Sequence, residues 1–367
     1  MKNLYKNQFA ILTLLLFCFG TLIPITNIHA EGKNPKEEKQ KVVKATFKVS
    51  EKHLLSISNK YGNVNFKNHD KNEVSVQVTI LAWARSDKEA QRMLDRIEID
   101  QDSDSEDRTV SFETEIEESR EGHNYNQGEG FEINYEIKIP KNLNVDVENK
   151  FGSVTLSDLN GKLNLQLKHG NFNAHNLTGM RHSISVEFGN LSINEVGSAD
   201  IEVAHGSINI DKSSTDLNVD SKHSNIRIDE ANLLEINAKH GNMRIGTVSK
   251  VTGENKFGQI EIRKVLKSAV LNLKHGSCQI ERIVKGFDRI EVENAHGGIE
   301  LRFDSDAKFQ FETRTEHGSI RNSMPNTTIQ RQEDDDHDKI LEGKTNGGGS
   351  GKVRVTNQHG SIRLEER

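Results

Sequence analysis

Residues 163–174 read LNLQLKHGNFNA. The leucines occupy every second position before the KHGN motif, and apolar residues resume two positions after the glycine. Alternation with a period of two is typical of a β-strand that buries one face. The apolar phase shifts by one residue at Gly170, so we expect the chain to turn a corner there. Glycine suits such a corner because it adopts a positive φ without steric cost.

The same unit recurs along the chain at a near-constant period. Motif glycines follow one another every 17 to 21 residues from Gly152 to Gly318, with Ser224 standing in once. A short unit repeated at a fixed period indicates a repeat protein in which each unit packs on its neighbours. The predicted corner glycines are Gly62, Gly152, Gly170, Gly189, Gly206, Gly241, Gly258, Gly276, Gly297, Gly318 and Gly360.

Each unit is predicted to be a strand, a glycine corner, a second strand and a loose turn. Stacked units would pair in parallel, with apolar side chains layered inside. We therefore predict an all-β fold, a parallel β-solenoid with about 18 residues per coil. Right-handed crossover is the general preference for parallel strands, which favours a right-handed, β-helix-like coil. A left-handed hexapeptide solenoid would show an aliphatic residue at every sixth position, and the strict alternation argues against it.

An insertion separates the first two motifs. Residues 74–84, 109–116 and 131–139 alternate as strands, and Ser86 and Glu89 have the spacing of a helix capping box. We expect residues 74–140 to form a small α+β cap near the N-terminal end. The polar residues 118–130 are expected to be a hairpin loop, and the acidic residues 102–107 a solvated turn.

The predicted domain organisation begins with a targeting segment. Residues 1–30 combine early lysines, an apolar run and a plausible cleavage position after Ala30, which indicates a signal peptide. Residues 31–43 are expected to be a flexible leader and residues 44–367 the solenoid, with an acidic and glycine-rich loop at 322–351. The mature chain keeps one cysteine, Cys278, so it forms no intramolecular disulfide. We expect an exported protein of the periplasm or cell surface that is not an integral membrane protein after cleavage.

The residue before each motif glycine is His in eight units, Phe in three and Tyr in one. It falls in phase with the inward aliphatic residues, so we expect its ring to be largely covered and stacked along the array. A metal-binding histidine ladder is the alternative, but strands about 4.8 Å apart place neighbouring rings too far apart to share an ion. No metal or cofactor is predicted. The predicted ring stack contains His169, Phe188, His205, His223, His240, Phe257, His275, His296, His317 and His359.

Two further columns flank the ring and the glycine. The residue after the glycine is mostly Asn or Ser, whose short side chains can bond neighbouring backbone groups at a turn. The residue before the ring is often lysine, and arginines project from the strands that follow. Together these cations could form a basic stripe that attracts an anionic polysaccharide or lipid headgroup, although a solvated charged face explains the same pattern. The candidate anion-binding residues are Lys222, Lys239, Lys256, Lys274, Arg227, Arg244 and Arg263.

No catalytic residue is predicted. Enzymes that act on polysaccharides need clustered carboxylates in one groove, and no predicted column is acidic over successive coils. Cys278 falls at an inward position, where a thiol is more often part of a core than a nucleophile. The sequence therefore favours a protein that is not an enzyme.

The exit from the insertion, YEIKIPKNLNVDVENKFGSVTL at 135–156, leads into the repeated corners. The chain closes with GKVRVTNQHGSIRLEE at 351–366. With the glycine-rich stretch before it, this pattern resembles the bacterial β-strand-repeat family named "putative adhesin", a domain family of unknown function. The resemblance covers roughly residues 45–367. It implies a right-handed β-helix-like fold in the bacterial envelope and supplies no catalytic residues.

These observations predict an exported, non-enzymatic module for adhesion or interaction at the cell envelope. The alternatives are a binder of anionic polysaccharide or lipid headgroups, an envelope sensor or scaffold component, and, least favoured, a polysaccharide-active enzyme. The expected partner is an unidentified envelope protein or glycan, and no nucleic acid is expected. An open solenoid end at Arg367 would leave an edge strand, which predicts end-to-end self-association.

Overall fold

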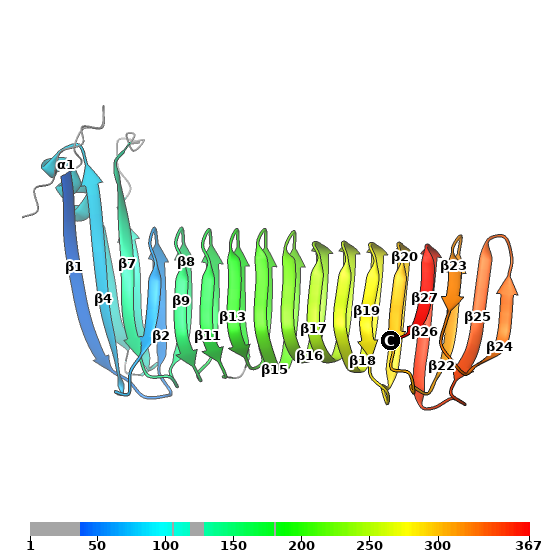
Figure 1. Ribbon diagram of the computed structural model, residues 1–367. Helices are drawn as coiled ribbons and strands as arrows, with labels where there is room; N and C mark the ends of the chain where they lie inside the picture. Colours follow the sequence, from blue (N-terminus) through cyan, green and yellow to red (C-terminus); the bar gives the residue numbers. More distant parts are fainter. Residues whose placement is uncertain (1–36, 105, 118–127, 180) are drawn as a thin grey trace, which may run out of the picture. The chain divides into compact units, whose positions relative to one another are not determined.

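The computed structural model describes residues 37–104, 106–117, 128–179 and 181–367 (Figure 1). In these residues the fold is nearly all β, with 27 strands in one hydrogen-bonded sheet and a single helix. The predicted signal peptide, the first part of the predicted leader and most of the predicted hairpin loop at 118–130 lie outside the described residues. The single helix of the described residues is neither long nor apolar enough to cross a membrane.

Two columns of parallel strands make up the main array, one on each side of the glycine corners. The column before the corners begins with β2 (Leu54–Lys60), β8 (Asn144–Lys150), β10 (Leu163–Lys168), β12 (His182–Glu187) and β14 (Ala199–Ala204). The column after the corners begins with β3 (Val64–Asn68), β9 (Val154–Leu159), β11 (Phe172–Leu177) and β13 (Asn190–Val196).

Four long strands continue both columns. They pass without a break from the column after one corner to the column before the next, so one strand serves two faces. These strands are β15 (Ser207–Lys222), β16 (Asn225–His240), β17 (Met243–Phe257) and β18 (Ile260–His275). Beyond them lie β19 (Cys278–Ile283), β20 (Arg289–His296) and β21 (Ile299–Phe303). The strand–corner–strand unit predicted from the sequence is therefore confirmed.

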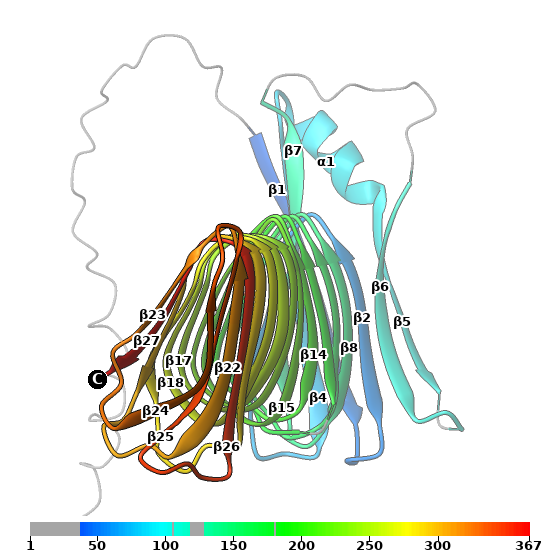
Figure 2. The same cartoon turned by 90° about the vertical axis from the view of Figure 1, so that its right-hand side faces the viewer.

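The core lies between the two columns, which Figure 2 shows along the stacking direction. Leu165 lies opposite Val147 in the preceding turn and Ile184 in the next, and all three side chains are buried. After the corner, Phe172 and Leu177 are fully buried in the same core. Each such side chain contributes about 1.5–3 kcal/mol when it leaves water. Parallel pairing in strict register thus turns a period-two sequence pattern into continuous apolar rows.

One of these inward positions holds a histidine that the sequence analysis missed. His182 is fully buried; its Nδ1 accepts a hydrogen bond from the Leu163 amide at 3.2 Å, and its Nε2 lies 3.2 Å from the Leu177 carbonyl oxygen. This pairing requires a neutral ring that donates from Nε2. Burial lowers the pKa of His182, because the apolar surroundings disfavour the charged imidazolium.

We expect the free energy of unfolding to fall in mild acid because of His182. The unfolded ring binds a proton more readily than the folded ring, so the contribution is full above about pH 6.5 and is lost as the pH falls to the lowered pKa of the folded state. His182→Leu should remove this acid dependence while costing about 1–3 kcal/mol at neutral pH, since the Leu163 amide loses its acceptor. Urea unfolding at several pH values measures both, and an unchanged acid dependence in the variant would contradict the assignment.

The insertion at the N-terminal end is α+β, as predicted. It contains β4 (Glu73–Ala84), α1 (Asp87–Asp95), β5 (Ile97–Asp104), β6 (Thr109–Ile116) and β7 (Gly130–Ile139). The Ser86 hydroxyl oxygen caps α1 by accepting a hydrogen bond from the Glu89 amide, and the same hydroxyl lies 3.1 Å from the Glu89 carboxylate. β7 joins the main array in parallel with β3, whereas β4 pairs antiparallel with β7. The acidic stretch predicted as a turn is partly strand, because β5 extends to Asp104 and pairs antiparallel with β6.

The predicted flexible leader is corrected over its second half. Residues from Glu37 onward form β1 (Glu37–Lys48), which pairs antiparallel with the whole of β4. The first half of β1 is charged and shows little apolar alternation, because this strand lies at the edge of the sheet and buries few side chains. Lysines along an edge strand are a common means of discouraging further strand addition.

The C-terminal end departs most from the sequence prediction. The last two strands, β26 (Gly351–His359) and β27 (Ser361–Glu366), lie between earlier ones. β26 pairs with β20 on one side and β22 (Phe309–Glu316) on the other, and β27 lies between β21 and β23 (Ser319–Asn322). Arg367 is therefore not at an open end of the array, and the edge strand predicted there is wrong.

The actual end of the array is a β-hairpin. β24 (Thr327–Asp334) and β25 (Asp338–Thr345) pair antiparallel, and β25 also pairs antiparallel with β22. Residues 322–351 were predicted to be an acidic and glycine-rich loop, so most of that loop is corrected to strand. The hairpin supplies β22 with hydrogen-bond partners that an exposed last strand would lack. Its outer strand is mostly exposed and polar, which hides the alternation that marks a buried strand.

Candidate functional site

The rings before the corner glycines form one continuous stack. Successive ring centroids lie 4.5–5.2 Å apart, and the planes of neighbouring rings differ by at most 9°. Because β26 is inserted before β22, His359 stacks between His296 and His317. In spatial order the stack is Tyr61, Phe151, His169, Phe188, His205, His223, His240, Phe257, His275, His296, His359 and His317.

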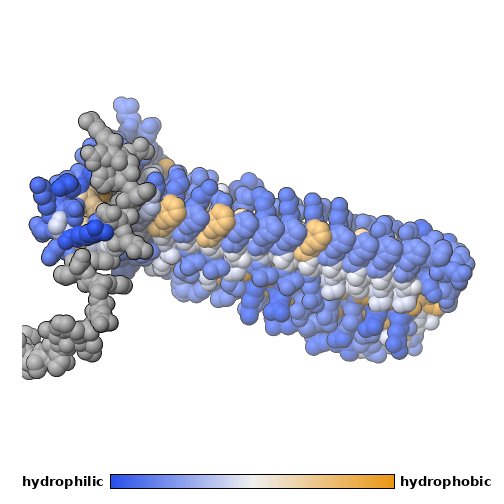
Figure 3. All heavy atoms as spheres, turned by 90° about the horizontal axis from the view of Figure 1, so that it is seen from above, coloured by the Kyte–Doolittle hydropathy of each residue, from blue (hydrophilic) through white to orange (hydrophobic). Residues whose placement is uncertain are grey.

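The stack lies on the surface, which corrects the expectation that the rings are covered. Phe151, Phe188 and Phe257 are 47%, 46% and 44% exposed, and the histidines of the stack are exposed too. Figure 3 shows isolated hydrophobic side chains along an otherwise hydrophilic edge. In seven turns the ring residue itself has a positive φ of 49–66°, as in His169 and Phe188. This left-handed conformation ends the strand alternation one residue early, so the ring swings outward instead of continuing the inward row.

Glycine is required at the corners mainly because the backbone of the preceding turn approaches closely, and less because of the φ angle of the glycine itself. A Cβ added at Gly170 would overlap the carbonyl oxygen of Gly152, and the same overlap with the preceding turn recurs at Gly189 and Gly206. A positive φ is confined to four corner glycines, which are Gly241, Gly258, Gly297 and Gly360. The predicted corner residues are therefore correct, but backbone packing between turns is the main reason for glycine.

Side-chain amides hold the corners together. Asn63 Oδ1 accepts a hydrogen bond from the Ser153 amide, and Asn225 Oδ1 accepts one from the Asn242 amide. This bonding from one turn to the next is the role expected for the column after the glycine. A second set points inward and was missed from the sequence, because asparagine at a buried position breaks the apolar pattern. Asn149, Asn255, Asn294 and Asn357 each donate a hydrogen bond to a corner carbonyl oxygen.

The ring stack stabilises the corner to a modest degree. Phe188 lies between His169 and His205 with 4.9 Å between centroids on both sides. We expect Phe188→Ala to lower the free energy of unfolding by about 0.5–1.5 kcal/mol, which is the range for one well-covered aromatic pair, because both contacts of Phe188 are half-exposed. Phe188→His should be nearly neutral, because histidine occupies the same position in most turns. Thermal unfolding would measure both variants, and an alanine variant as stable as the parent would show that stacking adds nothing.

The four candidate lysines lie in one exposed row before the corners. Because Ala238 pairs with Asn255 and His240 with Phe257, Lys239 lies opposite Lys256. The next register places Lys256 opposite Lys274 in the same way. Lys222 forms an ion pair with Glu202 at 3.0 Å. Lysines at the same position in consecutive turns therefore become direct neighbours.

The arginines do not join this row. Arg227 and Arg244 lie opposite each other in the column after the corner, and Glu261 occupies the next position of that row. Arg263 lies two residues beyond Glu261 on the same strand. The glycine corner separates the two sets, so the single stripe of lysines and arginines predicted from the sequence is wrong. Carboxylates also accompany the arginines, since Arg227 pairs with Asp229 at 3.1 Å and Arg244 with Glu261 at 3.5 Å.

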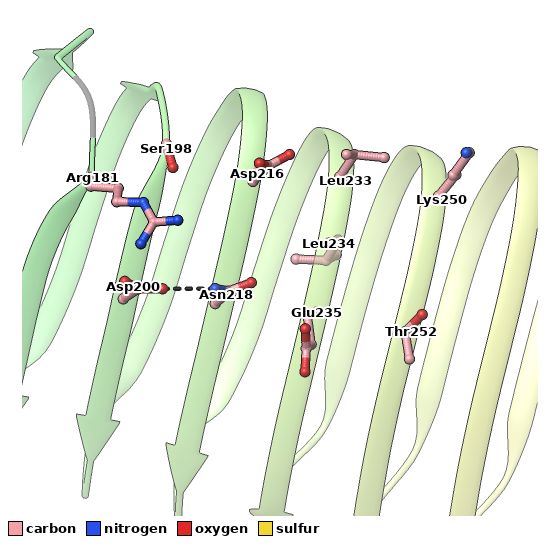
Figure 4. A pocket seen from close by; sticks show the side chains of 10 residues that line it. All are labelled: Arg181, Ser198, Asp200, Asp216, Asn218, Leu233, Leu234, Glu235, Lys250 and Thr252. Carbon is pink, nitrogen blue, oxygen red and sulfur yellow. Dashed lines mark hydrogen bonds between the residues drawn. The ribbon is translucent and has the colours of Figure 1, made fainter.

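A shallow groove of about 410 Å³ lies on the face that carries the lysine row (Figure 4). Asp200 and Asn218 face each other across neighbouring turns, and the Asn218 amide donates to the Asp200 carboxylate at 2.7 Å. The guanidinium of Arg181 points toward the next turn. The groove is lined by Arg181, Ser198, Asp200, Asp216, Asn218, Leu233, Leu234, Glu235, Lys250 and Thr252.

Cys278 occupies the inward position that the sequence predicted. It is buried and free, and burial raises its pKa to about 12. A thiol that stays protonated at neutral pH is a poor nucleophile. Within the described part of the chain, no three His, Cys, Asp or Glu side chains are arranged to hold a metal ion.

Comparison with known proteins finds solved structures that are described as adhesins but do not superpose closely on this chain. No family model matches this chain, and no curated protein matches it. A solved structure described as a "putative cell adhesion protein" from Clostridium sporogenes is 10% identical, with 91% of this chain and 100% of that chain covered and a TM-score of 0.19. A "putative adhesin" from Bacteroides fragilis is 13% identical over 88% and 97% of the two chains, with a TM-score of 0.28. Another from Parabacteroides merdae is 12% identical over 89% and 96%, with a TM-score of 0.27.

These names agree with the family that the repeat pattern resembles. TM-scores this low mean that the chains do not superpose as one rigid body.

Proposed function

We propose that this protein is an exported, right-handed β-solenoid that serves as an adhesion or interaction module of the cell envelope and is not an enzyme. The observation that carries the proposal is the register of outward polar side chains. Asp200, Asn218, Glu235 and Thr252 lie opposite one another on four consecutive turns. A surface that repeats hydrogen-bonding groups at every turn fits an extended partner lying along the stack.

The form of the groove supports binding of a large partner rather than turnover of a small substrate. Small-molecule sites usually enclose most of the ligand surface in a largely apolar pocket. Here the groove is shallow, and within the row the carboxylates Asp200 and Glu235 alternate with the neutral side chains of Asn218 and Thr252. The third carboxylate of the groove, Asp216, lies outside this row and opposite Leu233. Alternation of this kind supplies donors and acceptors for recognition and separates the carboxylates that acid–base catalysis would use together.

Binding of the purified protein to envelope preparations tests the proposal. We expect saturable binding that weakens when the groove is altered by Asn218→Ala and Glu235→Ala. The matched control changes polar outward residues in the column after the corner, Asn209→Ala and Gln279→Ala, and should bind like the parent. Equal binding by both double variants would exclude the groove as the contact surface. Release of reducing sugars from envelope polysaccharides would overturn the non-enzymatic assignment.

A further inference from the structure

Part of the lysine row carries uncompensated charge. Lys239, Lys256 and Lys274 lie directly opposite one another on consecutive turns, and among the described residues none of the three forms an ion pair. Like charges directly opposite each other on neighbouring strands repel. A bound anion would relieve this repulsion, so the row is a candidate site for a ligand with several negative charges.

Histidines lie beside this row at every turn except the one that carries Phe257. His223, His240 and His275 each follow a lysine directly, and His205 stacks on His223 at 5.1 Å. Stacking covers the ring faces, so the exposed part of each ring is its edge, which carries the nitrogens. Imidazole is the side chain that changes charge between about pH 5 and pH 8. A row of imidazole edges therefore lies beside the row of lysines.

Other charged groups set the balance at this corner. On the lysine face, Glu202, Asp220 and Glu254 lie one outward position away from the row and offset part of its charge. Glu187 interacts electrostatically with His205, but it is held by Lys168 at 2.8 Å. Past the corner, Arg227 is paired with Asp229 and Arg244 with Glu261, and Arg263 and Glu281 lie on the same face.

We propose that this corner, the His–Lys edge, binds a linear anionic polysaccharide and that mild acid strengthens the binding. The His–Lys edge consists of His205, Lys222, His223, Lys239, His240, Lys256, Lys274 and His275. The inference deepens the proposed function, on which it rests, by naming the chemistry of one partner. Proton uptake and anion binding are linked, because a bound polyanion offsets repulsion between neighbouring charged rings.

The arrangement of charge favours a linear polymer over a membrane surface. The cations form a narrow row that follows the stacking direction, one lysine per turn. A flat anionic membrane pressed against this face would also meet Glu202, Asp220 and Glu254. A chain of regularly spaced anionic sugars can instead follow the row, with these carboxylates along one side and the histidine edges along the other.

Heparin is a suitable probe because its sulfate groups stay ionised throughout the pH range of the test. We expect the purified protein to bind it about tenfold more tightly at pH 5.5 than at pH 7.5 at constant ionic strength, since the added charges act at short range. The triple variant His205→Phe, His223→Phe and His240→Phe keeps a ring at each position, as at Phe188 and Phe257. It should retain the binding of the parent at pH 7.5 and lose most of the gain in acid, since His275 is the one histidine of the edge that remains.

Control variants separate this site from general charge effects. His296→Phe with His359→Phe changes the same stack where Ala295 and Gln358 replace lysine, and it should keep the tenfold gain. Lys239→Gln, Lys256→Gln and Lys274→Gln together should abolish binding at both pH values with an unchanged circular dichroism spectrum.

Three results would overturn the inference. These are pH-independent binding by the parent, a full acid gain in the triple histidine variant, and binding to phosphatidylglycerol vesicles without binding to heparin. Absence of heparin binding with intact binding to envelope preparations would reject the His–Lys edge alone. Loss of binding to both would reject the proposed function as well.

Discussion

Gly297→Ala is expected to lower the free energy of unfolding by about 3 kcal/mol or more. Gly297 has a φ of 128°, which an alanine rarely adopts. A Cβ at this position would overlap the carbonyl oxygen of Gly276 in the preceding turn and would lie 3.4 Å from Nδ2 of Asn294. The obstacle is backbone that pairs on both sides, so relief requires two turns to separate. Loss of that register would disturb the apolar rows on both faces of the corner.

The next residue provides a matched control. A Cβ at Gly298 would meet only Ser361, with its Oγ at 3.7 Å, and the backbone there is not left-handed. Gly298→Ala should therefore change stability by less than about 1 kcal/mol, and it also lowers the entropy of the unfolded chain. Urea unfolding followed by circular dichroism compares the two variants directly. Similar midpoints would show that contact between turns does not fix glycine at the corners.

The sequence predicts the repeating turn well because its physical signals are local. Alternation such as Leu163, Leu165 and Leu167 marks an inward face, and parallel pairing in register brings equivalent residues of successive turns together. The lysine row follows from the same logic, since Lys239 and Lys256 occupy the same position in the motif. Where successive turns repeat the same motif, residues at the same motif position lie opposite each other in the structure.

The sequence predictions fail where the same local sequence pattern is compatible with two backbone conformations or two faces. Counting by twos places His169 with the inward leucines, but its φ of 55° turns the ring outward. A single backbone angle changes the face, and apolar alternation does not encode it. The sequence pattern groups the arginines with the lysines because both point outward, whereas the corner between Lys222 and Arg227 puts them on different faces.

The order of the strands at the end of the array is mispredicted for a different reason. It depends on which of several exposed strand edges the last strands pair with. The strand that contains Val355 is as regular as any other, and the sequence does not reveal which earlier strand it joins. It inserts between β20 and β22, where it finds a partner on each side. The polar hairpin of β24 and β25 then covers β22.

Removal of residues 351–367 is therefore expected to detach the end of the array from its preceding turns. The deletion takes away four buried apolar side chains, each worth about 1.5–3 kcal/mol as an upper estimate. These are Val353, Val355, Ile362 and Leu364. It also removes the strands that link β20 to β22 and β21 to β23. In a stacked array each turn depends on its neighbours, so the loss should stay local to the end.

Limited proteolysis with mass spectrometry tests this expectation. Cleavage should appear between residues 304 and 350 in the deletion variant, while the turns from β8 to β18 stay protected. Val355→Asp should give a weaker form of the same pattern, because it buries a charge at a fully buried position. Arg354→Ala on the same strand removes only an exposed ion pair with Glu312 at 3.2 Å, so its pattern should match that of the parent. If β22 instead moved onto β20 and restored the parallel stack, residues 304–350 would stay protected, and the inserted strands would not be what holds the end in place.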